Sequence, residues 1–347
     1  MKKIIIYGTG SYVLGNSHIK PVILPAIYKF LQKFKYEFEI IFIKKSSKNI
    51  TLTKKKINEI SKNFKINFNY KIYSLSKINN NKLLKNFKSE DIFCSIICTP
   101  DNEHYKVALD CLKKSINIIV VKPLVLSVKE NLNLIKISKL NNCVGFVDYH
   151  KRFDNHSKLI KEFNLNQINN LYSIDINYSQ KKIISYNIFK WVNESNILNY
   201  LGSHYIDFVF HTSGFTPKSV MAIGIKKFLY SRGINTYDSI ICLVKWSKGN
   251  NEFILNLKTN WIDPLNESSM SDQKVTLHYT NSKIISDQKN RGFYISSDTD
   301  NYESVNPDFN QQYQNNKSFT KKYEGYGIES MLTFLKLINK KLNGIKF

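Results

Sequence analysis

The 347-residue chain lacks an apolar run long enough to cross a bilayer as a helix, which takes about 18 residues. Its first apolar run, residues 1–7, ends at a glycine and is too short for a secretory leader. Five cysteines make an odd, sparse set, and four of them lie in strand-like or helical apolar runs. We therefore expect a cytoplasmic protein with buried, reduced thiols, no disulfide, no bound metal and no membrane partner.

Arginine is scarce although the chain is strongly basic. The formal net charge is +24, yet only three of the 51 basic residues are arginines, namely Arg152, Arg232 and Arg291. The lysines are scattered beside abundant Asn and Ile, a distribution typical of A/T-rich codons, and no helix-turn-helix, finger or RNA-binding motif accompanies them. We expect no nucleic-acid partner, whereas anionic small molecules remain compatible with the charge.

Short β-rich runs alternate with amphipathic stretches through the first 150 residues. The apolar periodicity predicts strands at 3–7, 39–43, 92–98, 117–121 and 143–148. It predicts helices at 23–34, 54–63, 103–114 and 128–140. Such alternation indicates a parallel sheet with helices on both faces, so we expect a doubly wound α/β domain of the Rossmann type at 1–150.

The pattern changes in the second half of the chain. The 347 residues exceed what one hydrophobic core usually organises, which favours two domains or one domain with a large extension. Longer alternating segments predict strands at 171–178, 219–228, 239–246, 252–261 and 274–278. Helices are predicted at 196–211 and 328–342. We therefore expect an α+β domain with an open, mostly antiparallel sheet at 151–347, closed by the last helix.

Tyr200, His204 and Asp207 stand at i, i+4 and i+7 of the helix predicted at 196–211, which puts them on one face. An imidazole carries protons near neutral pH, and a phenol four residues earlier can share its hydrogen bonds. The same helix also has an apolar face, so a core histidine and a packed tyrosine remain the alternative. His204, Asp207 and His211 have zinc-like spacing, but His211 lies near the predicted helix end, and we expect no metal there.

A glycine turn follows the first predicted strand directly. Gly8 and Gly10 fit a dinucleotide-binding turn, in which the first glycine permits the bend and the second lets backbone approach a pyrophosphate. Ser11 and Tyr12 follow at the helix start, where N–H groups favour phosphate. Val13 stands where a third small residue is usual. We expect a dinucleotide cofactor here, with a purely structural turn as the alternative.

Two lysines end the second predicted strand, where NAD-preferring sites usually carry an acidic residue for the ribose hydroxyls. Lys44 and Lys45 instead offer ammonium groups, which suit a 2′-phosphate. The sequence thus slightly favours NADP over NAD, although solvated lysines at a loop tip explain the pattern equally well.

Two further segments follow neighbouring strands and therefore reach one crevice, outside the carboxyl ends of the sheet. They are Thr99-Pro100-Asp101-Asn102-Glu103-His104 and Val121-Lys122-Pro123-Leu124. With them, the sequence resembles the Gfo/Idh/MocA family of oxidoreductases over nearly the whole chain. The resemblance rests on the glycine turn, the T-P-x-x-x-H loop, the E-K-P motif as Val-Lys-Pro, and G-x-H-x-x-D as Gly202 to Asp207.

The resemblance implies a Rossmann domain and a larger second domain whose open sheet often serves in oligomerisation, so we expect a homo-oligomer. It implies NAD(P)-linked oxidation or reduction of sugars, sugar acids, cyclitols or nucleotide sugars. The cofactor contacts would include the turn and Thr99, Pro100, Asn102, His104 and Lys122. Lys122 would also polarise the reacting oxygen; a surface lysine before a proline is the alternative.

His204 would be the general acid/base by the same resemblance. The chain departs from the family at two acidic positions, because Tyr200 stands where many members have Asp and Val121 replaces the glutamate of E-K-P. Tyr200 could therefore transfer the proton itself or orient His204, or it could only pack.

Arg152, Trp191 and Asp207 are the expected substrate contacts. Arg152 lies in a segment similar to the family's N-x-R-F crossing and can make forked hydrogen bonds. Trp191 offers an aromatic face to a sugar, and Asp207 offers a carboxylate to its hydroxyls. Structural roles are open for each. The alternative functions are a non-catalytic NAD(P)-binding regulator, suggested by the missing acidic residues, and a bilin- or imine-type reductase, whose pocket would be more apolar and less dependent on His204.

Overall fold

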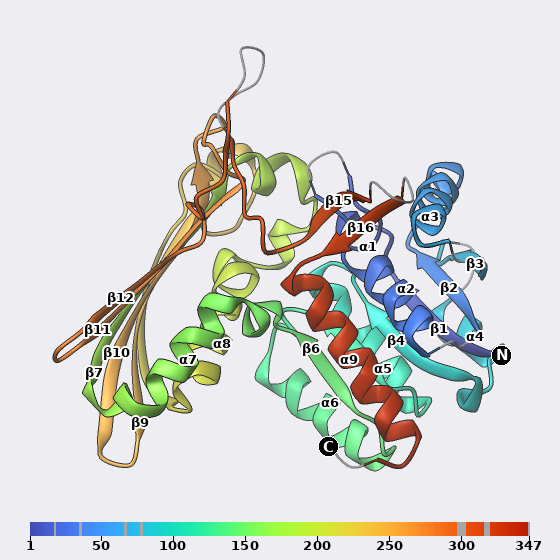
Figure 1. The fold of residues 1–347 in the computed structure, drawn as a ribbon, viewed down its shortest axis with the longest axis horizontal. Helices are drawn as coiled ribbons and strands as arrows, with labels where there is room; N and C mark the ends of the chain where they lie inside the picture. Colours follow the sequence, from blue (N-terminus) through green and yellow to red (C-terminus); the bar gives the residue numbers. More distant parts are fainter. Residues whose placement is uncertain are drawn as a thin grey trace. The chain divides into compact units, whose positions relative to one another are not determined.

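The computed structural model describes residues 1–16, 19–34, 37–65, 68–76, 79–296, 303–315 and 320–345. The chain forms two compact units (Figure 1). The first comprises residues 1–150 and 308–347, and the second comprises residues 151–307. The sequence predicts residues 151–347 as the second domain, whereas the C-terminal segment 308–347 lies in the first unit.

The first unit is built on a six-stranded parallel sheet with the order β3-β2-β1-β4-β5-β6. Its strands are β1 (Lys2–Tyr7), β2 (Phe38–Lys44), β3 (Asn69–Ser74), β4 (Ile92–Ile97), β5 (Ile118–Val121) and β6 (Gly145–Asp148). The predicted doubly wound sheet is confirmed. Strand order reverses between β1 and β4, and ligands bind outside the carboxyl ends of strands at such a point.

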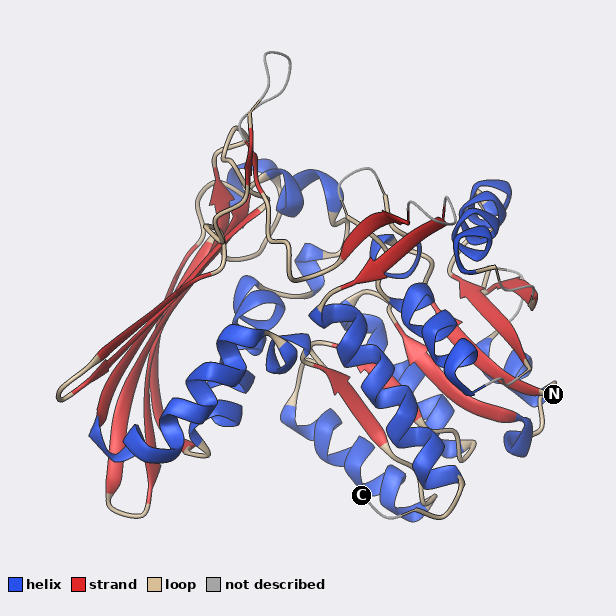
Figure 2. Ribbon diagram, viewed as in Figure 1, coloured by secondary structure: helices blue, strands red, loops and turns tan. Residues whose placement is uncertain are grey.

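Helices flank this sheet (Figure 2). They are α1 (Ser11–Leu14), α2 (Ile23–Phe34), α3 (Ile50–Phe64), α4 (Asn80–Lys85), α5 (His104–Lys113), α6 (Val128–Leu140) and α9 (Tyr326–Leu342). The sequence did not predict β3 or α4. Strand β3 lies at the sheet edge and is mostly exposed or half-buried, so its apolar pattern is weak, and α4 has only six residues.

The last helix, α9, packs in the first unit against α2, β4 and β6. Its apolar face buries Met331, Leu335 and Ile338, and the ring of Phe334 stacks on Phe146 of β6 with centroids 5.1 Å apart. The short hairpin before it, β15 (Gln311–Asn315) with β16 (Thr320–Glu324), contacts α3. An amphipathic pattern predicts that a helix is buried, but it does not say against which sheet.

The second unit has a six-stranded sheet with the order β12-β11-β7-β10-β9-β8. Its strands are β7 (Leu171–Lys181), β8 (Thr216–Ile225), β9 (Ser239–Lys248), β10 (Asn251–Asp263), β11 (Ser271–Tyr279) and β12 (Lys283–Asp287). Only β7 and β10 pair in parallel, so the predicted mostly antiparallel sheet is confirmed. A small hairpin joins β13 (Tyr294–Ile295) and β14 (Glu303–Ser304).

One face of this sheet is covered by α7 (Asn155–Gln167) and α8 (Ser203–Ser213), whose apolar side chains share a core with the strands. Trp246, Leu257 and Trp261 are fully buried there. The helix predicted at 196–211 exists in two parts, a π-helical turn at Leu198–Gly202 followed by α8. None of the helices in the described ranges is long and apolar enough to cross a membrane.

Candidate functional site

The glycine turn after β1 has the geometry that a pyrophosphate needs. Gly8 has a φ of 96°, and a Cβ added there would lie 2.4 Å from the carbonyl oxygen of Cys98, so only glycine fits. At Gly10 an added Cβ would meet nothing within 4 Å. The turn therefore leans on the loop after β4 on one side and leaves Gly10 open on the other, which fits a dinucleotide cofactor.

The helix after the turn is unusually short. The α1 helix has four residues and ends at Gly15, where φ is 71° and an added Cβ would meet Cδ of Pro21 at 2.8 Å. Val13, in place of the third small residue, is fully buried. Gly15 thus serves the turn that ends α1. A four-residue helix has little dipole, so a bound phosphate would depend mainly on the N–H groups of the turn.

Tyr12 of the turn is hydrogen-bonded within the first unit. Its hydroxyl donates to Oδ2 of Asp148, the last residue of β6, over 2.6 Å. Oδ1 of the same carboxylate accepts a 2.6 Å hydrogen bond from Ser330 of α9. Ser11 accepts a hydrogen bond from the side chain of Asn16 over 2.7 Å. The Tyr12 hydroxyl is thus engaged in fixing the turn.

His104 connects the two loops that resemble family motifs. Its ring nitrogens lie 2.6 Å from the carbonyl oxygen of Pro123 and 2.9 Å from that of Thr99, and the side chain is fully buried. Pro100 is half-buried and Asn102 is exposed. His104 therefore holds the loop after β4 to the loop after β5, and Asn102 is the more accessible to a ligand.

Lys122 follows β5, whose neighbours in the sheet are β4 and β6. Two buried carboxylates belong to the ends of those neighbours, Asp101 after β4 and Asp148 at the end of β6. Burial lowers the pKa of Lys122 to about 8, although the negative charges of Asp101 and Asp148 oppose the change. The peptide bond between Lys122 and Pro123 is cis. Near neutral pH this amine holds a proton that it can share.

The two lysines at the end of β2 have intramolecular partners. Nζ of Lys44 donates to the carbonyl oxygen of Lys48 over 2.9 Å and to Oγ1 of Thr53 over 2.8 Å. Lys45 is largely exposed and forms an ion pair of 2.9 Å with Glu103. Lys45 is thus the more available of the two to a phosphate, since its contact with Glu103 is an exposed ion pair of small energy.

In the second unit, Arg152 and Asp207 form one bidentate ion pair. Nε of Arg152 lies 2.8 Å from Oδ2 of Asp207, and a terminal nitrogen lies 2.5 Å from Oδ1. The aspartate side chain is 9% exposed and the arginine side chain 38%. Burial raises the pKa of Asp207, while Arg152 opposes that shift. The structure thus joins two residues that the sequence proposed separately.

Tyr200 lies in an aromatic cluster with the predicted substrate residue Trp191. Their ring centroids are 5.7 Å apart, Phe189 lies 5.2 Å from Tyr200 and stacks on Trp191 at 4.8 Å, and Trp261 lies 6.2 Å from Tyr200. The tyrosine belongs to the π-helical turn. Such turns occur frequently at functional sites. Tyr200 is half-buried, so its ring can pack in this cluster and its hydroxyl can also form a hydrogen bond.

His204 is the second residue of α8 and is 3% exposed. Asp207, three residues later, is already paired with the guanidinium of Arg152, which disfavours a cation beside it. Among the residues that the structure describes, no group of three or more His, Cys, Asp or Glu side chains could hold a metal ion.

Comparison with known proteins identifies the first unit. Residues 2–149 match the model of a family described as an oxidoreductase family with an NAD-binding Rossmann fold. This part of the chain is therefore similar to the Gfo/Idh/MocA oxidoreductases. The resemblance proposed from the motifs is therefore confirmed.

Relatives of known structure or function agree with this assignment. Over 131 residues the chain is 28% identical to the scyllo-inositol 2-dehydrogenase (NADP(+)) IolW of Bacillus subtilis, which covers 37% of this chain and 36% of that relative. The fold of scyllo-inositol dehydrogenase from Lactobacillus casei, solved with NAD(H) and scyllo-inositol, matches with a TM-score of 0.65 at 13% identity, covering 100% of this chain and 90% of the other.

Myo-inositol 2-dehydrogenase from Lactobacillus plantarum matches with a TM-score of 0.63 at 13% identity, covering 99% and 90% of the two chains. At such identities the solved structures show only that both units share the fold of these dehydrogenases. The matched part of the curated relative is little more than a third of its length.

Sequence reasoning missed two residues near Lys122 and two near Tyr200. Asp101 and Asp148 lie at the ends of strands that neighbour β5, so the rule that placed Lys122 in the crevice also applied to them. Phe189 and Trp261 come from segments distant from Tyr200 in sequence, and no local pattern indicated their contact.

Substitution of the two glycines should separate folding from cofactor binding. Gly8→Ala should lower the free energy of unfolding by about 1–3 kcal/mol, because the methyl group meets the Cys98 carbonyl and φ is unfavourable. Gly10→Ala should leave stability unchanged, because its methyl group projects into open space at the turn. It should weaken NAD(P)H binding by roughly tenfold or more, because the pyrophosphate of the cofactor would occupy that space. Urea unfolding and nucleotide fluorescence titration measure the two effects. Unchanged binding in Gly10→Ala would contradict the assigned role.

Proposed function

We propose that this protein is an NAD(P)-dependent oxidoreductase acting on a hydroxyl or carbonyl group of a sugar, sugar acid, cyclitol or nucleotide sugar. The observation that carries the proposal is Lys122, an amine with a pKa of about 8 at the carboxyl end of β5 in a family of NAD-binding oxidoreductases. The inositol dehydrogenases among its relatives support a polyol as the substrate class.

The turn at Gly8 and Gly10 would hold the pyrophosphate of the cofactor, with Ser11 and Tyr12 shaping the turn. Thr99, Asn102 and Lys122 would line the nicotinamide end, and His104 would keep their loops together. When bound, the nicotinamide supplies the hydride acceptor for oxidation or the hydride donor for reduction.

Lys122 and His204 would manage the charge and the proton. In the oxidation direction, the C–H bond of the substrate gives up a hydride, the O–H bond gives up a proton, and a C=O bond forms. The ammonium of Lys122 would stabilise alkoxide character on that oxygen. The imidazole of His204 would accept the proton, the role that the family resemblance gives it. Tyr200 would orient His204 or share its proton.

The substrate residues would act as two sets. The half-exposed guanidinium of Arg152, fixed by Asp207, would donate to hydroxyl or carboxylate oxygens, so Asp207 would act through Arg152. The ring of Trp191, stacked on Phe189, would offer an apolar face to the sugar ring.

Three substitutions test this mechanism. With myo- and scyllo-inositol and a panel of sugar acids as substrates, Lys122→Ala and His204→Ala should each lower kcat by roughly 10²–10⁴-fold, because each removes charge stabilisation or proton transfer. Tyr200→Phe keeps the aromatic packing and should lower kcat only if the hydroxyl takes part. If both alanine variants retain full turnover, the mechanism is wrong. Tight NAD(P)H binding without turnover of any polyol would favour the alternative that the protein is a non-catalytic NAD(P)-binding regulator.

We also propose NADP as the preferred cofactor, since Lys45 offers an accessible ammonium at the end of β2 and IolW is an NADP enzyme. Lys45→Ala should weaken NADP binding roughly tenfold, about 1.4 kcal/mol, and leave NAD binding unchanged. Glu103→Gln should strengthen NADP binding, because it releases Lys45. Calorimetric titration with both nucleotides measures the difference. Equal losses for NADP and NAD would contradict the preference.

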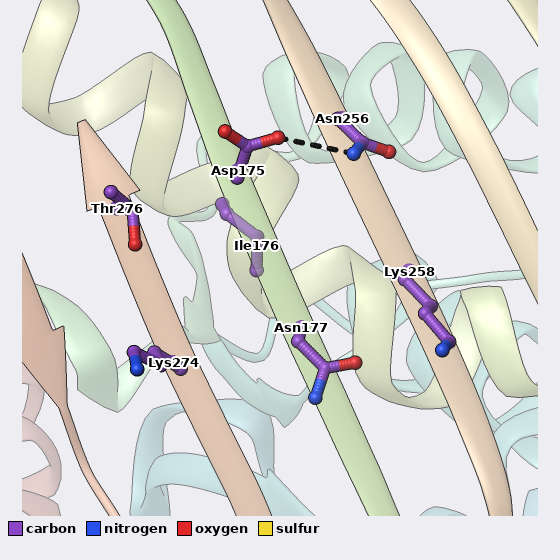
Figure 3. A pocket seen from close by; sticks show the side chains of 7 residues that line it. All are labelled: Asp175, Ile176, Asn177, Asn256, Lys258, Lys274 and Thr276. Carbon is purple, nitrogen blue, oxygen red and sulfur yellow. Dashed lines mark hydrogen bonds between the residues drawn. The ribbon is translucent and has the colours of Figure 1, made fainter. Parts of the chain in front are cut away.

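Self-association through the second sheet is a further part of the proposal. On the side of the sheet away from α7 and α8, Met221 pairs with Leu243 and Ile223 with Ile241, and all four are exposed, by 44–68%. Beside them, around Asp175, the same face is polar and hollowed, with a cavity of about 320 Å³ (Figure 3). So large an apolar strip on one face favours burial against a second copy.

A charge on this strip should break the assembly. Met221→Asp should convert the oligomer to a monomer in size-exclusion chromatography with light scattering, because a carboxylate cannot be buried there without a partner. Val220→Asp is the matched control, since Val220 neighbours Met221 on β8, is equally exposed and points to the opposite side of the sheet. A wild-type monomer at all concentrations would rule out self-association.

A further inference from the structure

Lys122 belongs to a Val-Lys-Pro segment that lacks the glutamate of the E-K-P motif it resembles. Val121 occupies the position where the resemblance places a glutamate, so the motif supplies no negative charge. A half-buried ammonium loses much of its hydration, and nearby carboxylates can compensate for that loss. Any compensating negative charge in this unit must therefore come from carboxylates outside the motif.

Two carboxylates belong to the ends of the strands that neighbour β5. Strand β5 pairs in parallel with β6, and Val121 stands opposite Asp148. Lys122 is the next residue, so its backbone follows directly after the pair of Val121 and Asp148, and the charges of Lys122 and Asp148 act on each other. On the other neighbour of β5, Asp101 follows the end of β4. Both carboxylates are almost fully buried, with exposures of 1% and 4%.

Asp148 differs from Asp101 because it also holds the glycine turn. Its two oxygens accept from Tyr12 of the turn and Ser330 of α9, each over 2.6 Å. Burial raises the pKa of Asp148 to about 6, although these two hydrogen bonds and Lys122 oppose the shift. Its carboxylate is therefore mostly ionised at neutral pH, where it stabilises the ammonium.

We propose that Asp148 is a positioning residue that replaces the missing glutamate as a charge partner of Lys122 and links this lysine to the glycine turn through Tyr12. The inference rests on the proposed function for the use that the reaction makes of Lys122. The electrostatic link itself needs no substrate. A change in the hydrogen bond between Tyr12 and Asp148 should alter the proton affinity of Lys122.

Chemical labelling of Lys122 in the full chain tests the link without turnover. The free amine reacts with acetic anhydride and the ammonium does not. The labelling rate against pH, followed by peptide mass spectrometry, should therefore have its midpoint near pH 8 in the native protein. Asp148→Asn removes the charge; its amide oxygen can still accept from one of the hydroxyls of Tyr12 and Ser330, and its NH2 group can donate to the other. The midpoint should move to lower pH, and labelling at pH 7 should become severalfold faster.

Tyr12→Phe provides a second variant with the same sign. Without the phenol, the ionised form of Asp148 loses a hydrogen bond, so the carboxylate protonates more readily and the Lys122 midpoint should fall by less than in Asp148→Asn. Asp110→Asn is the matched control, because Asp110 is a hydrogen-bonded carboxylate of the same unit, on α5, whose partner is Asn80. Its midpoint should equal that of the native protein.

An unchanged or raised midpoint in Asp148→Asn with a native circular dichroism spectrum would overturn the proposal. If Asp148→Asn does not fold, an unchanged midpoint in Tyr12→Phe would overturn it instead. A lowered midpoint in a protein that turns over no polyol would support the link and refute the proposed activity. If polyol turnover requires Lys122 but the labelling midpoint of Lys122 is the same in Asp148→Asn, the proposed activity is supported and the link to Asp148 is refuted.

Discussion

The parallel sheet of the first unit brings charged side chains together at one edge, and the site depends on this constraint. All six strands end at the same side, so residues that follow β4, β5 and β6 meet although tens of residues separate them. The ammonium that follows β5 is then stabilised electrostatically by carboxylates after β4 and at the end of β6. Each charge makes the burial of the other less costly, which a single strand could not achieve.

The glycine turn belongs to the same arrangement. Gly8 lies so close to the carbonyl group of Cys98 that no side chain fits between the loop after β1 and the loop after β4. Tyr12 extends this connection to β6, and Ser330 extends it to α9. The turn, β6 and α9 are therefore joined by two hydrogen bonds to one carboxylate.

Much of the fold could be predicted from apolar periodicity. The bounds of α2 and α6 agree with the prediction to the residue, although α2 is buried over most of its length and α6 buries only Leu134. Strand β12 was missed, since Lys283–Asp287 is short and lies at a sheet edge. Helix α9 was predicted with nearly correct bounds but in the wrong unit, because periodicity reports burial and not the burying partner.

The candidate site was predictable in its residues and less so in its contacts. Strand ends and glycine spacing indicated Gly8, Gly10 and Lys122 directly. The pairing of Arg152 with Asp207 crosses 55 positions of sequence, and no local pattern encodes it. The same holds for the aromatic neighbours of Tyr200. Long-range side-chain contacts depend on how helices are set on the sheet, which single residues do not determine.

The return of the chain to its first unit has a consequence for the order of folding. Residues 308–347 supply α9 and the hairpin before it, so the nucleotide-binding unit is discontinuous and the second unit is an insertion within it. During synthesis, β6 and its Asp148 emerge long before Ser330. The apolar surface that α9 covers on β4 and β6 stays exposed until the end of the chain is made. The nucleotide-binding unit, whose strands are made first, can thus be completed only after the second unit has been made.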